Sequence, residues 1–275
     1  MRKFWLISVI ALAVGGAPLT GFAADKESAT SSDIDKLIKR LEESGALDAA
    51  IGRSIQRQAE RQAERQAEAR RKQEEEQRRL QNEASKNARR VDVNRDRVLG
   101  NQQAEVSVIV YSDFECPYCK HFAATPEQAI AGFDGKANVV FRHYPLPFHG
   151  EMAKRAAYYA ECVGRQAGSK AFFTFTNDWF KLTKSNGQGL ERGDAQIKEI
   201  AQAAGAKDVA SLDACAGNPA VARLVEDDTT DGMLSGINGT PGSIIRNNKT
   251  GLSLAISGAV PAEILEQGIR KALMN

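Results

Sequence analysis

Two cysteines, Cys116 and Cys119, are separated by two residues at the point where an apolar strand should give way to a helix. The strand is predicted over Val106–Tyr111, a nearly continuous β-branched and aromatic run typical of a strand buried on both faces. Pro117 suits the first position of the following helix. Cys116 then lies just ahead of the helix, where unpaired backbone N–H groups and the helix dipole stabilise a thiolate. The spacing predicts a redox dithiol, with Cys116 as the nucleophile and Cys119 as the resolving thiol.

Charged and titratable neighbours are expected to modulate the nucleophile. Glu115 places negative charge beside it and disfavours the thiolate, whereas Lys120 favours the thiolate. His121 can influence the sulfur from the first turns of the helix, and His143 and His149 flank a loop further along the chain. The three histidines do not form a catalytic set, and we expect each to be partly buried with one hydrogen bond.

A Cys-x-x-Cys pair has two other uses. A zinc site usually needs two further ligands with matching spacing, but the remaining cysteines, Cys162 and Cys215, are isolated. A structural bridge between residues so close together would be strained and would stabilise little. We therefore expect a redox site without a metal or another cofactor.

The elements that must position the dithiol indicate an α/β domain. Pro126 is expected to kink or split the helix that follows the dithiol. Asn247–Gly251 is expected to join the last two strands as a hairpin. The remaining predicted elements are strands at 137–143, 244–246 and 252–256, five helices within 151–234, and an amphipathic helix at 261–274.

The segment Tyr111–Cys119, which reads YSDFECPYC, resembles the active-site segment of DsbA-like thioredoxin-superfamily proteins, the periplasmic thiol:disulfide interchange proteins. A second stretch, Gly239–Gly242, resembles the loop whose cis-proline faces the dithiol in such folds. The resemblance implies that Pro241 is cis and that the backbone of Thr240 pairs with a bound substrate next to Cys116. By itself the stretch also fits a simple turn, whereas a phosphate-binding loop would need a following Lys-Ser/Thr.

The resemblance covers about residues 104–275 and implies a thioredoxin fold interrupted by a helical subdomain at about 151–235. We place this catalytic domain at 91–275, after a charged α-helical stalk or linker at 24–90. The stalk matches the family only in general character.

The first residues are typical of a secretory signal peptide. Arg2 and Lys3 precede an apolar run, Phe4–Val14, and Gly21–Ala23 offers small residues for cleavage before Ala24. The run is broken before it reaches the roughly 20 residues that a membrane-spanning helix needs. Residues 1–23 are therefore expected to be removed, and the mature protein is expected in the oxidising periplasm, where disulfides persist.

Cys162 and Cys215 each fall in a predicted helix of the insertion, and proteins similar to this one often carry a pair at such places. In an oxidising compartment they are most simply a structural disulfide, worth about 2 to 4 kcal/mol because the loop is long. Two buried free thiols or a second, slower redox pair are the alternatives.

Residues 31–90 are rich in Glu, Arg, Gln and Ala, with no aromatic residue and no proline. Ser32–Asp33 is expected to cap a helix, and the apolar residues of Ile34–Ile55 recur at helical spacing, which favours pairing with a copy of the same helix. Arg-Gln-Ala-Glu occurs three times over Arg57–Glu68. Because this four-residue repeat exceeds the 3.6 residues of a helical turn, its alanines wind around the helix and make a poor coiled-coil seam. We predict an oligomerisation element followed, at 57–90, by a solvated helical spacer or partly disordered linker. A solvated tail without an assembly role is the alternative.

Composition and resemblance together limit the partners. A net charge of +2, with glutamates interleaved among the arginines, argues against nucleic acid. The resemblance implies unfolded or misfolded disulfide-containing proteins as substrates and a membrane thiol reductase or oxidase as redox partner. The N-terminal helix implies a homo-oligomer, a dimer or a trimer.

Three features bear on the direction of the reaction. Thr240 before the cis-proline resembles the disulfide isomerase and ScsC-like branches, whereas the dedicated oxidase carries valine there. An oligomerisation stalk also resembles those isomerases, but Pro117–Tyr118 between the cysteines occurs in several branches. We therefore expect a disulfide isomerase or reductase. The alternatives are a monomeric dithiol oxidase, a periplasmic chaperone and a Cu(I)-binding protein that uses both thiolates.

Overall fold

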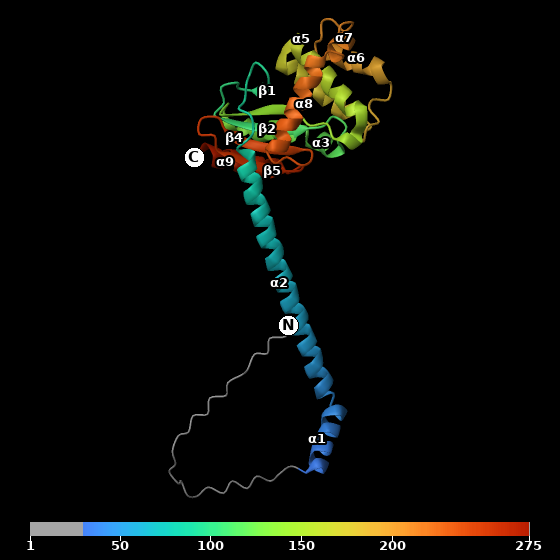
Figure 1. The fold of residues 1–275 in the computed structure, drawn as a ribbon, viewed down its shortest axis with the longest axis vertical. Coiled ribbons are helices and arrows are strands. Elements are labelled where there is room, and N and C mark those ends of the chain that lie inside the picture. The colour runs from blue at the N-terminus through green and yellow to red at the C-terminus, as the bar shows by residue number, and fades with distance from the viewer. Residues whose placement is uncertain (1–29, 275) are drawn as a thin grey trace, which may run out of the picture. The chain divides into compact units, whose positions relative to one another are not determined.

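The computed structural model describes residues 30–274, so the signal peptide predicted at 1–23 lies outside the described residues. The chain divides into two compact units, one that ends at Glu68 and one that spans Ala69–Asn275. Figure 1 labels most of the helices and strands of both units. Within residues 30–274, no helix is both long and apolar enough to cross a membrane.

The first unit contains helix α1, Ser31–Glu43, and the beginning of helix α2, Ala46–Ser85. Thr30 caps α1 in a capping box with Asp33 at the third helical position, so the cap lies earlier than predicted. Gly45, with a φ of 66°, follows α1 in the left-handed conformation that commonly ends a helix. The spacer predicted from residue 57 onward is helical as far as the end of α2.

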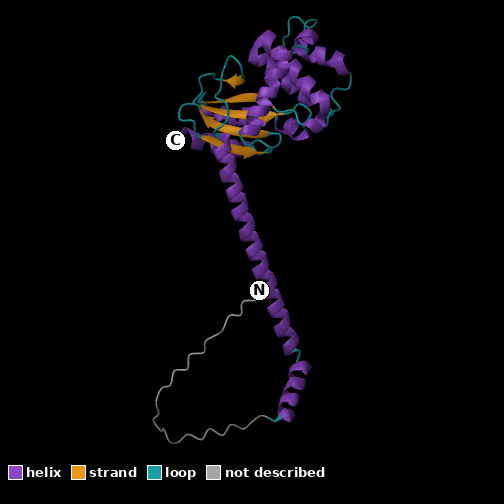
Figure 2. Ribbon diagram, in the orientation of Figure 1, coloured by secondary structure: helices purple, strands orange, loops and turns teal. Residues whose placement is uncertain are grey.

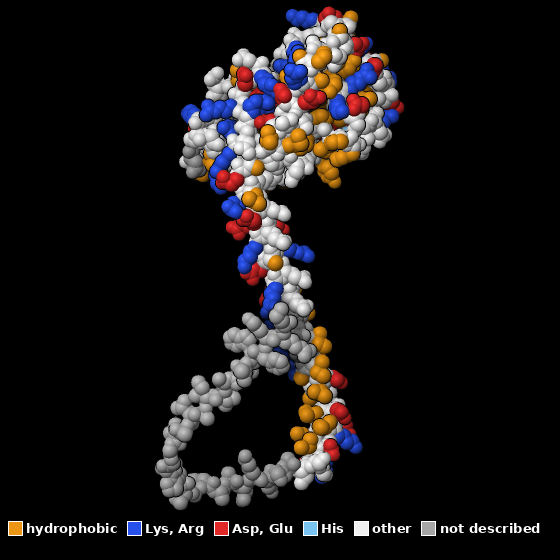
Figure 3. Space-filling model, viewed as in Figure 1, with side chains coloured by type: hydrophobic (Ala, Val, Ile, Leu, Met, Phe, Trp, Pro, Cys, Tyr) orange, Lys and Arg blue, Asp and Glu red, His pale blue; other side chains and the backbone are white. Residues whose placement is uncertain are grey.

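Both helices of the first unit carry exposed apolar side chains at helical spacing (Figure 3). Leu37 is 59% exposed and Ile51 is 49% exposed, and α1 has no buried residue. An apolar stripe left in solvent favours contact with another apolar surface. The members of this stripe are Ile34, Leu37, Ile38, Leu41, Leu47, Ile51 and Ile55.

The second unit is built on a five-stranded sheet with the strand order β1-β3-β2-β4-β5 (Figure 2). β2 and β3 are parallel, and the other neighbouring strands are antiparallel. The central strand β2 is buried along its whole length, as its sequence predicts. The strands are Arg97–Gly100 (β1), Val106–Ser112 (β2), Ala137–His143 (β3), Gly242–Asn247 (β4) and Ser253–Ser257 (β5).

The helices of the second unit follow the predicted order. Pro126 lies at the start of α4 and separates it from α3. Two of the predicted helices of the insertion are merged in α5, across a kink at Gly168, whose φ is 83°. The helices are Pro117–Phe122 (α3), Thr125–Ile130 (α4), Gly150–Leu182 (α5), Gly193–Ala203 (α6), Leu212–Ala216 (α7), Pro219–Leu234 (α8) and Ala262–Leu273 (α9).

Alternating side chains of β2 build a core on each face of the sheet. Val106, Val108 and Val110 belong to a cluster that includes residues of α4 and α9. Ile109 and Tyr111 belong to the cluster on the opposite face. There α8 approaches so closely at Gly232 that a Cβ atom would stand 2.9 Å from the ring of Tyr111. The sheet is therefore covered on both sides, and its central strand can carry the site at its end.

The last turns of α2 belong to the second unit and pack on the edge of the sheet. Gln81 Nε2 donates to Ser257 Oγ at 2.7 Å, and Asn82 Oδ1 accepts from the Ala255 N–H at 2.9 Å. Ala88, just beyond the helix, is buried among the core residues of one sheet face. The domain boundary predicted at residue 91 therefore falls inside this unit, which begins at Ala69 by its contacts.

Candidate functional site

The dithiol lies where β2 ends and α3 begins. Cys116 has extended backbone angles and is the N-cap of α3, whose first residue is Pro117. Cys119 lies one turn further along and is only 1% exposed. Both cysteines are buried, and their sulfurs are not bonded to each other. The local sequence thus places one sulfur at the positive end of a helix and covers the other.

The loop before β4 meets the dithiol. The Thr240–Pro241 peptide bond is cis, and Cys116 Sγ lies 3.4 Å from the Thr240 carbonyl oxygen, to which its protonated form donates a hydrogen bond. Gly242, the first residue of β4, pairs with Tyr111 near the end of β2, which carries the loop to this position. The structure therefore brings together two segments that lie 124 residues apart in the sequence.

The two thiols differ in their affinity for a proton. The pKa of Cys116 is lowered to about 6, chiefly because the Cys119 thiol donates a hydrogen bond to its sulfur. Thr240 and the backbone N–H groups of Cys119 and Tyr118 also lower this pKa, whereas burial opposes them. Burial raises the pKa of Cys119 well above its ordinary value, and the Cys116 sulfur adds to this through the hydrogen bond and through charge repulsion. At neutral pH, Cys116 is therefore a thiolate while Cys119 keeps its proton.

This arrangement can form and resolve a mixed disulfide. The Cys116 thiolate is the attacking group, and the Cys119 thiol lies within hydrogen-bonding reach of the sulfur that it must later attack. In the described part of the chain, no three histidine, cysteine or acidic side chains are grouped so that they could hold a metal ion.

Glu115, expected to repel the thiolate, is fully buried in a set of hydrogen bonds with the helical insertion. Its carboxylate accepts from Trp179 Nε1 at 3.1 Å, from Thr183 Oγ1 at 2.7 Å and from the Gly189 N–H at 2.9 Å. These contacts give Glu115 a structural role, the anchoring of the insertion beside the dithiol. The sequence does not reveal it because the donors lie 64 to 74 positions away.

The other residues that flank the cysteines in the sequence, Lys120 and His121 among them, lie within α3 itself. Lys120 Nζ donates to the Thr183 carbonyl oxygen at 2.7 Å, so this charge also binds the insertion. The side chain of His121 is exposed, and Tyr118 is 66% exposed. Pro117 occupies the first turn, as predicted. Of these residues, Tyr118 acts on the nucleophile through its backbone N–H.

Asp113, which the sequence did not single out, fixes the approach to the dithiol. It is buried, and its Oδ1 accepts from the Glu115 N–H at 2.7 Å. Its Oδ2 accepts from the Leu146 N–H and bonds Nδ1 of His149, both at 2.7 Å. The Asp113 N–H donates to Cys119 Sγ at 3.5 Å. An acidic residue directly after a buried strand was the available signal for this role.

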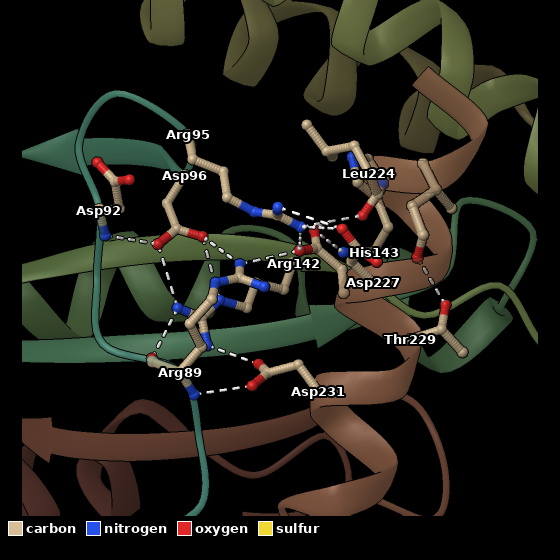
Figure 4. Close-up of polar contacts among 12 residues, drawn as sticks. Arg89, Asp92, Arg95, Asp96, Arg142, His143, Leu224, Asp227, Thr229 and Asp231 are labelled. Atoms are coloured by element: carbon tan, nitrogen blue, oxygen red, sulfur yellow. Dashed lines mark hydrogen bonds and ion pairs between the residues drawn. The ribbon is translucent and has the colours of Figure 1, made fainter. Parts of the chain in front are cut away.

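A buried cluster of charges fastens the segment after α2 to β3 and α8 (Figure 4). Arg142 is fully buried, and its guanidinium binds Asp96 at 3.1 Å and Asp231 at 2.7 Å. Arg89 binds Asp96 at 2.9 Å and Asp228 at 3.0 Å. Each buried charge thus has a partner of opposite sign, which is the condition for burying it at tolerable cost.

The helical insertion has a disulfide of its own. Cys162 of α5 and Cys215 of α7 are bonded, with 5.9 Å between their Cα atoms and 53 positions between them in the sequence. Next to Cys162, the Glu161 carboxylate pairs with Arg97 and with His143 Nε2, the latter at 3.0 Å. The structure therefore contains the pairing that the resemblance implied, separate from the dithiol.

Comparison with known proteins places the chain in a family. The sequence profile of the family described as Thioredoxin matches residues 92–258. The Na⁺/H⁺ antiporter NhaA of Herminiimonas arsenicoxydans is 30% identical over 151 residues, which are 55% of this chain and 22% of the antiporter. A second antiporter, NhaA 1 of Salinispora arenicola, is 40% identical over 76 residues, 28% of this chain and 12% of the antiporter. The chain thus spans less than a quarter of the length of these curated relatives.

Solved structures resemble the chain over a larger share. Pseudomonas aeruginosa DsbA2 is 29% identical, with a TM-score of 0.55, and the match covers 65% of this chain and 92% of DsbA2. BcfH of Salmonella enterica Typhimurium is 15% identical, with a TM-score of 0.65 and coverage of 88% and 99%. A linker-deletion mutant of Proteus mirabilis ScsC is 18% identical, with a TM-score of 0.56 and coverage of 91% and 99%. The last two show the fold alone. With its predicted thioredoxin fold confirmed, the chain belongs to the thioredoxin family as a DsbA-like member.

Proposed function

We propose that this protein is an oxidoreductase that exchanges thiols and disulfides in other proteins through Cys116 and Cys119. The proposal is carried by the Cys116 sulfur, whose pKa is lowered to about 6 and which lies 3.4 Å from the Thr240 carbonyl oxygen of the cis-proline loop. The likeness to Pseudomonas aeruginosa DsbA2 supports it. The loop at Thr240 and Pro241 holds a substrate segment next to Cys116.

The reaction proceeds by two displacements at sulfur. The Cys116 thiolate attacks one sulfur of a substrate disulfide, so a mixed disulfide forms and the other substrate sulfur leaves as a thiolate, which takes up a proton. Cys119 then loses its proton and attacks the Cys116 sulfur, which releases the second substrate thiolate. Two electrons pass from the dithiol to the substrate disulfide. When a substrate thiolate displaces Cys116 first, the substrate is isomerised and no net electrons pass.

We assign the isomerase or reductase direction to the protein. Thr240 before the cis-proline supports this, as does the apolar stripe of α1 and α2, which would join copies of the chain into a dimer or trimer. The stripe keeps seven large apolar side chains exposed in the single chain. Burying even half of that surface in a helix–helix contact stabilises an oligomer by several kcal/mol, since each such side chain contributes about 1.5 to 3 kcal/mol when fully buried.

A monomeric dithiol oxidase is the second candidate, because one observation favours it. Whatever stabilises the Cys116 thiolate stabilises the reduced protein relative to the disulfide, and this makes the Cys116–Cys119 disulfide a stronger oxidant. The same thiolate is the better leaving group when a substrate displaces it. The lowered pKa therefore favours oxidation of substrate thiols by the Cys116–Cys119 disulfide.

The periplasm is the proposed location, on the basis of the leader predicted at 1–23 and the Cys162–Cys215 disulfide, a bond that persists in oxidising compartments. The proposed substrates are unfolded or misfolded proteins that contain disulfides. A membrane thiol reductase or oxidase returns the dithiol to its working state.

The test compares the mature protein with the double variant L37E/I51E on a scrambled multi-disulfide substrate, with the mass of each protein in solution. Both side chains are exposed in the single chain, so the substitutions leave its own packing intact. The control is K39E, which changes charge on the same helix at a residue outside the stripe. We expect an oligomer that restores substrate activity, and a monomeric double variant that exchanges small disulfides but no longer unscrambles.

Two outcomes would contradict parts of this assignment. If the mature protein is monomeric and unscrambles the substrate no better than the double variant, the isomerase assignment is wrong. The protein is then a simple dithiol oxidoreductase. Unscrambling that survives in Cys116→Ala would exclude the dithiol as the active group and favour a chaperone.

A further inference from the structure

The last turns of helix α2 lie beside the cis-proline loop. Gln81 Nε2 donates to Ser257 Oγ at 2.7 Å and to the Gly236 carbonyl oxygen at 3.4 Å. Gly236 is in the left-handed conformation, and a Cβ atom there would stand 3.0 Å from Ala84 Cβ, so backbone and helix approach closely. The helix is therefore fixed in place next to the loop that meets Cys116.

Two adjoining hollows extend from the loop to the helix. The first, of about 160 Å³, is lined by Thr240 and Pro241 on one side and by Gln81 on the other. The second, of about 520 Å³, continues along the helix past Leu80 and Gln77. Gln81, Asn238 and Ser257 line both, so we treat them as one surface, the α2 groove.

The chemistry of the α2 groove fits a peptide backbone. Its polar side chains are neutral amides and hydroxyls, which donate to and accept from peptide groups without regard to sequence. Leu80, 54% exposed, offers one apolar contact. None of the described residues that line the groove carries a charge, so nothing there would attract a phosphate or an acidic ligand.

We propose that the α2 groove binds the extended segment of a substrate polypeptide that flanks its reacting cysteine, so that the end of the stalk helix is a wall of the substrate site. This inference rests on the proposed thiol–disulfide exchange. The groove begins at Thr240, whose carbonyl oxygen contacts Cys116 Sγ, so a chain lying in the groove has its cysteine next to the nucleophile. Neutral amide contacts suit a protein that must accept many sequences.

The test uses two chromogenic disulfides that differ only in the length of chain. One is a ten-residue neutral peptide whose central cysteine is joined to thionitrobenzoate, and the other is free cysteine joined to the same group. The Cys116 thiolate attacks the cysteine sulfur and expels thionitrobenzoate, and Cys119 then displaces the peptide or cysteine thiolate. The substrate disulfide is reduced to two thiols while the dithiol becomes a disulfide.

The measured quantity is the ratio of the second-order rate constants for the peptide and for cysteine. We expect this ratio to fall about fivefold in Leu80→Glu and in Asn238→Ala, a residue that lines both hollows, which corresponds to loss of about one net hydrogen bond or apolar contact. The rate constant for cysteine should stay the same. Arg78→Gln is the matched control, because it changes the net charge by the same amount as Leu80→Glu at an exposed residue of α2 that does not line the groove.

If the ratio is unchanged in both groove variants, or is near one in the wild type, the α2 groove does not bind the peptide. The proposed thiol–disulfide exchange would be unaffected by that result. A wild-type protein that reacts with neither substrate would overturn the proposed function, and the groove with it. A fall of equal size in Arg78→Gln would show a general effect on the helix and would also overturn the inference. Leu80 is exposed, so its variant is expected to fold.

Discussion

The hydrogen bond from Cys119 should account for a measurable part of the acidity of Cys116. With a pKa of about 6, Cys116 is about 90% thiolate at pH 7, whereas a cysteine at the ordinary value of 9.0 is only about 1% thiolate there. The influences that lower this pKa must together exceed the difference of 3 units between 9.0 and about 6, because burial acts against them. The Cys119 thiol is the largest of the four named. Its removal in Cys119→Ala is therefore expected to raise the pKa by about 1 unit or more, which leaves about half or less of Cys116 as thiolate at pH 7.

Cys119→Ser is the matched variant, because its hydroxyl keeps a donor in the same place. We expect its Cys116 pKa to stay close to that of the wild type. The assay is the ultraviolet absorbance of the thiolate as a function of pH in the reduced proteins, with Cys116→Ala as the blank, and the alkylation rate as a second readout. If the alanine and serine variants both titrate with the wild type, the backbone N–H groups of α3 and not the thiol set the acidity.

The same two pKa shifts predict how pH changes the stability of the reduced protein. The folded pKa of Cys116 lies below its unfolded value, so its contribution is present above the unfolded pKa and is lost as pH falls through about 6. The folded pKa of Cys119 is raised, so its contribution is present below the unfolded pKa and is lost at alkaline pH. Relative to the oxidised protein, in which neither thiol titrates, the reduced form should gain stability from pH 6 to about 8.5 and lose it above. A difference that is flat from pH 6 to about 8.5 would contradict the lowered pKa of Cys116, and one that stays level above pH 8.5 would contradict the raised pKa of Cys119.

Three further variants test the scaffold. The double variant C162A/C215A should unfold with a free energy lower by about 4 kcal/mol, the loop-closure value for 53 positions, as measured by denaturant unfolding; a loss under about 1 kcal/mol would contradict the entropic account. Arg142→Met leaves Asp96 and Asp231 buried without their shared cation and should cost about 3 to 5 kcal/mol in the same measurement. Lys249→Met, which removes a cation that is 72% exposed beside Glu105, should cost no more than about 1 kcal/mol, and equal losses in the two variants would refute the role of burial.

The parts of the fold that follow from local chemistry were predictable. The strand expected at 137–143 is β3 with the same bounds, because its β-branched and aromatic centre leaves no helical alternative. Pro126 divides α3 from α4 because its ring cannot continue a helix. β1 escaped prediction, since four residues that begin with Arg97 and end with Gly100 carry almost no pattern, and only pairing with β3 makes them a strand.

The candidate site divides in the same way. The spacing of Cys116 and Cys119 predicts the reacting sulfurs. The cis-proline loop at Thr240–Pro241 is predicted from its resemblance to the corresponding stretch of the family. The sequence gives no sign that Glu115 is held by the insertion or that Arg142 is buried with Asp231, since a charged residue is ordinarily exposed. Such pairs form across long separations, and only the assembled fold brings the partners together.

β5 is the last strand of the sheet, and the Asn82 side chain of α2 accepts its Ala255 N–H. The chain therefore supplies its own cover for an edge that could otherwise pair with a strand of another molecule. A protein trimmed back to residue 91 would lose that cover, and β5 could then recruit the β5 of a neighbour. If the form that begins at residue 91 self-associates, the exposed edge of β5 would be the cause. A truncated form should therefore begin at or before Ala69, where the second unit begins.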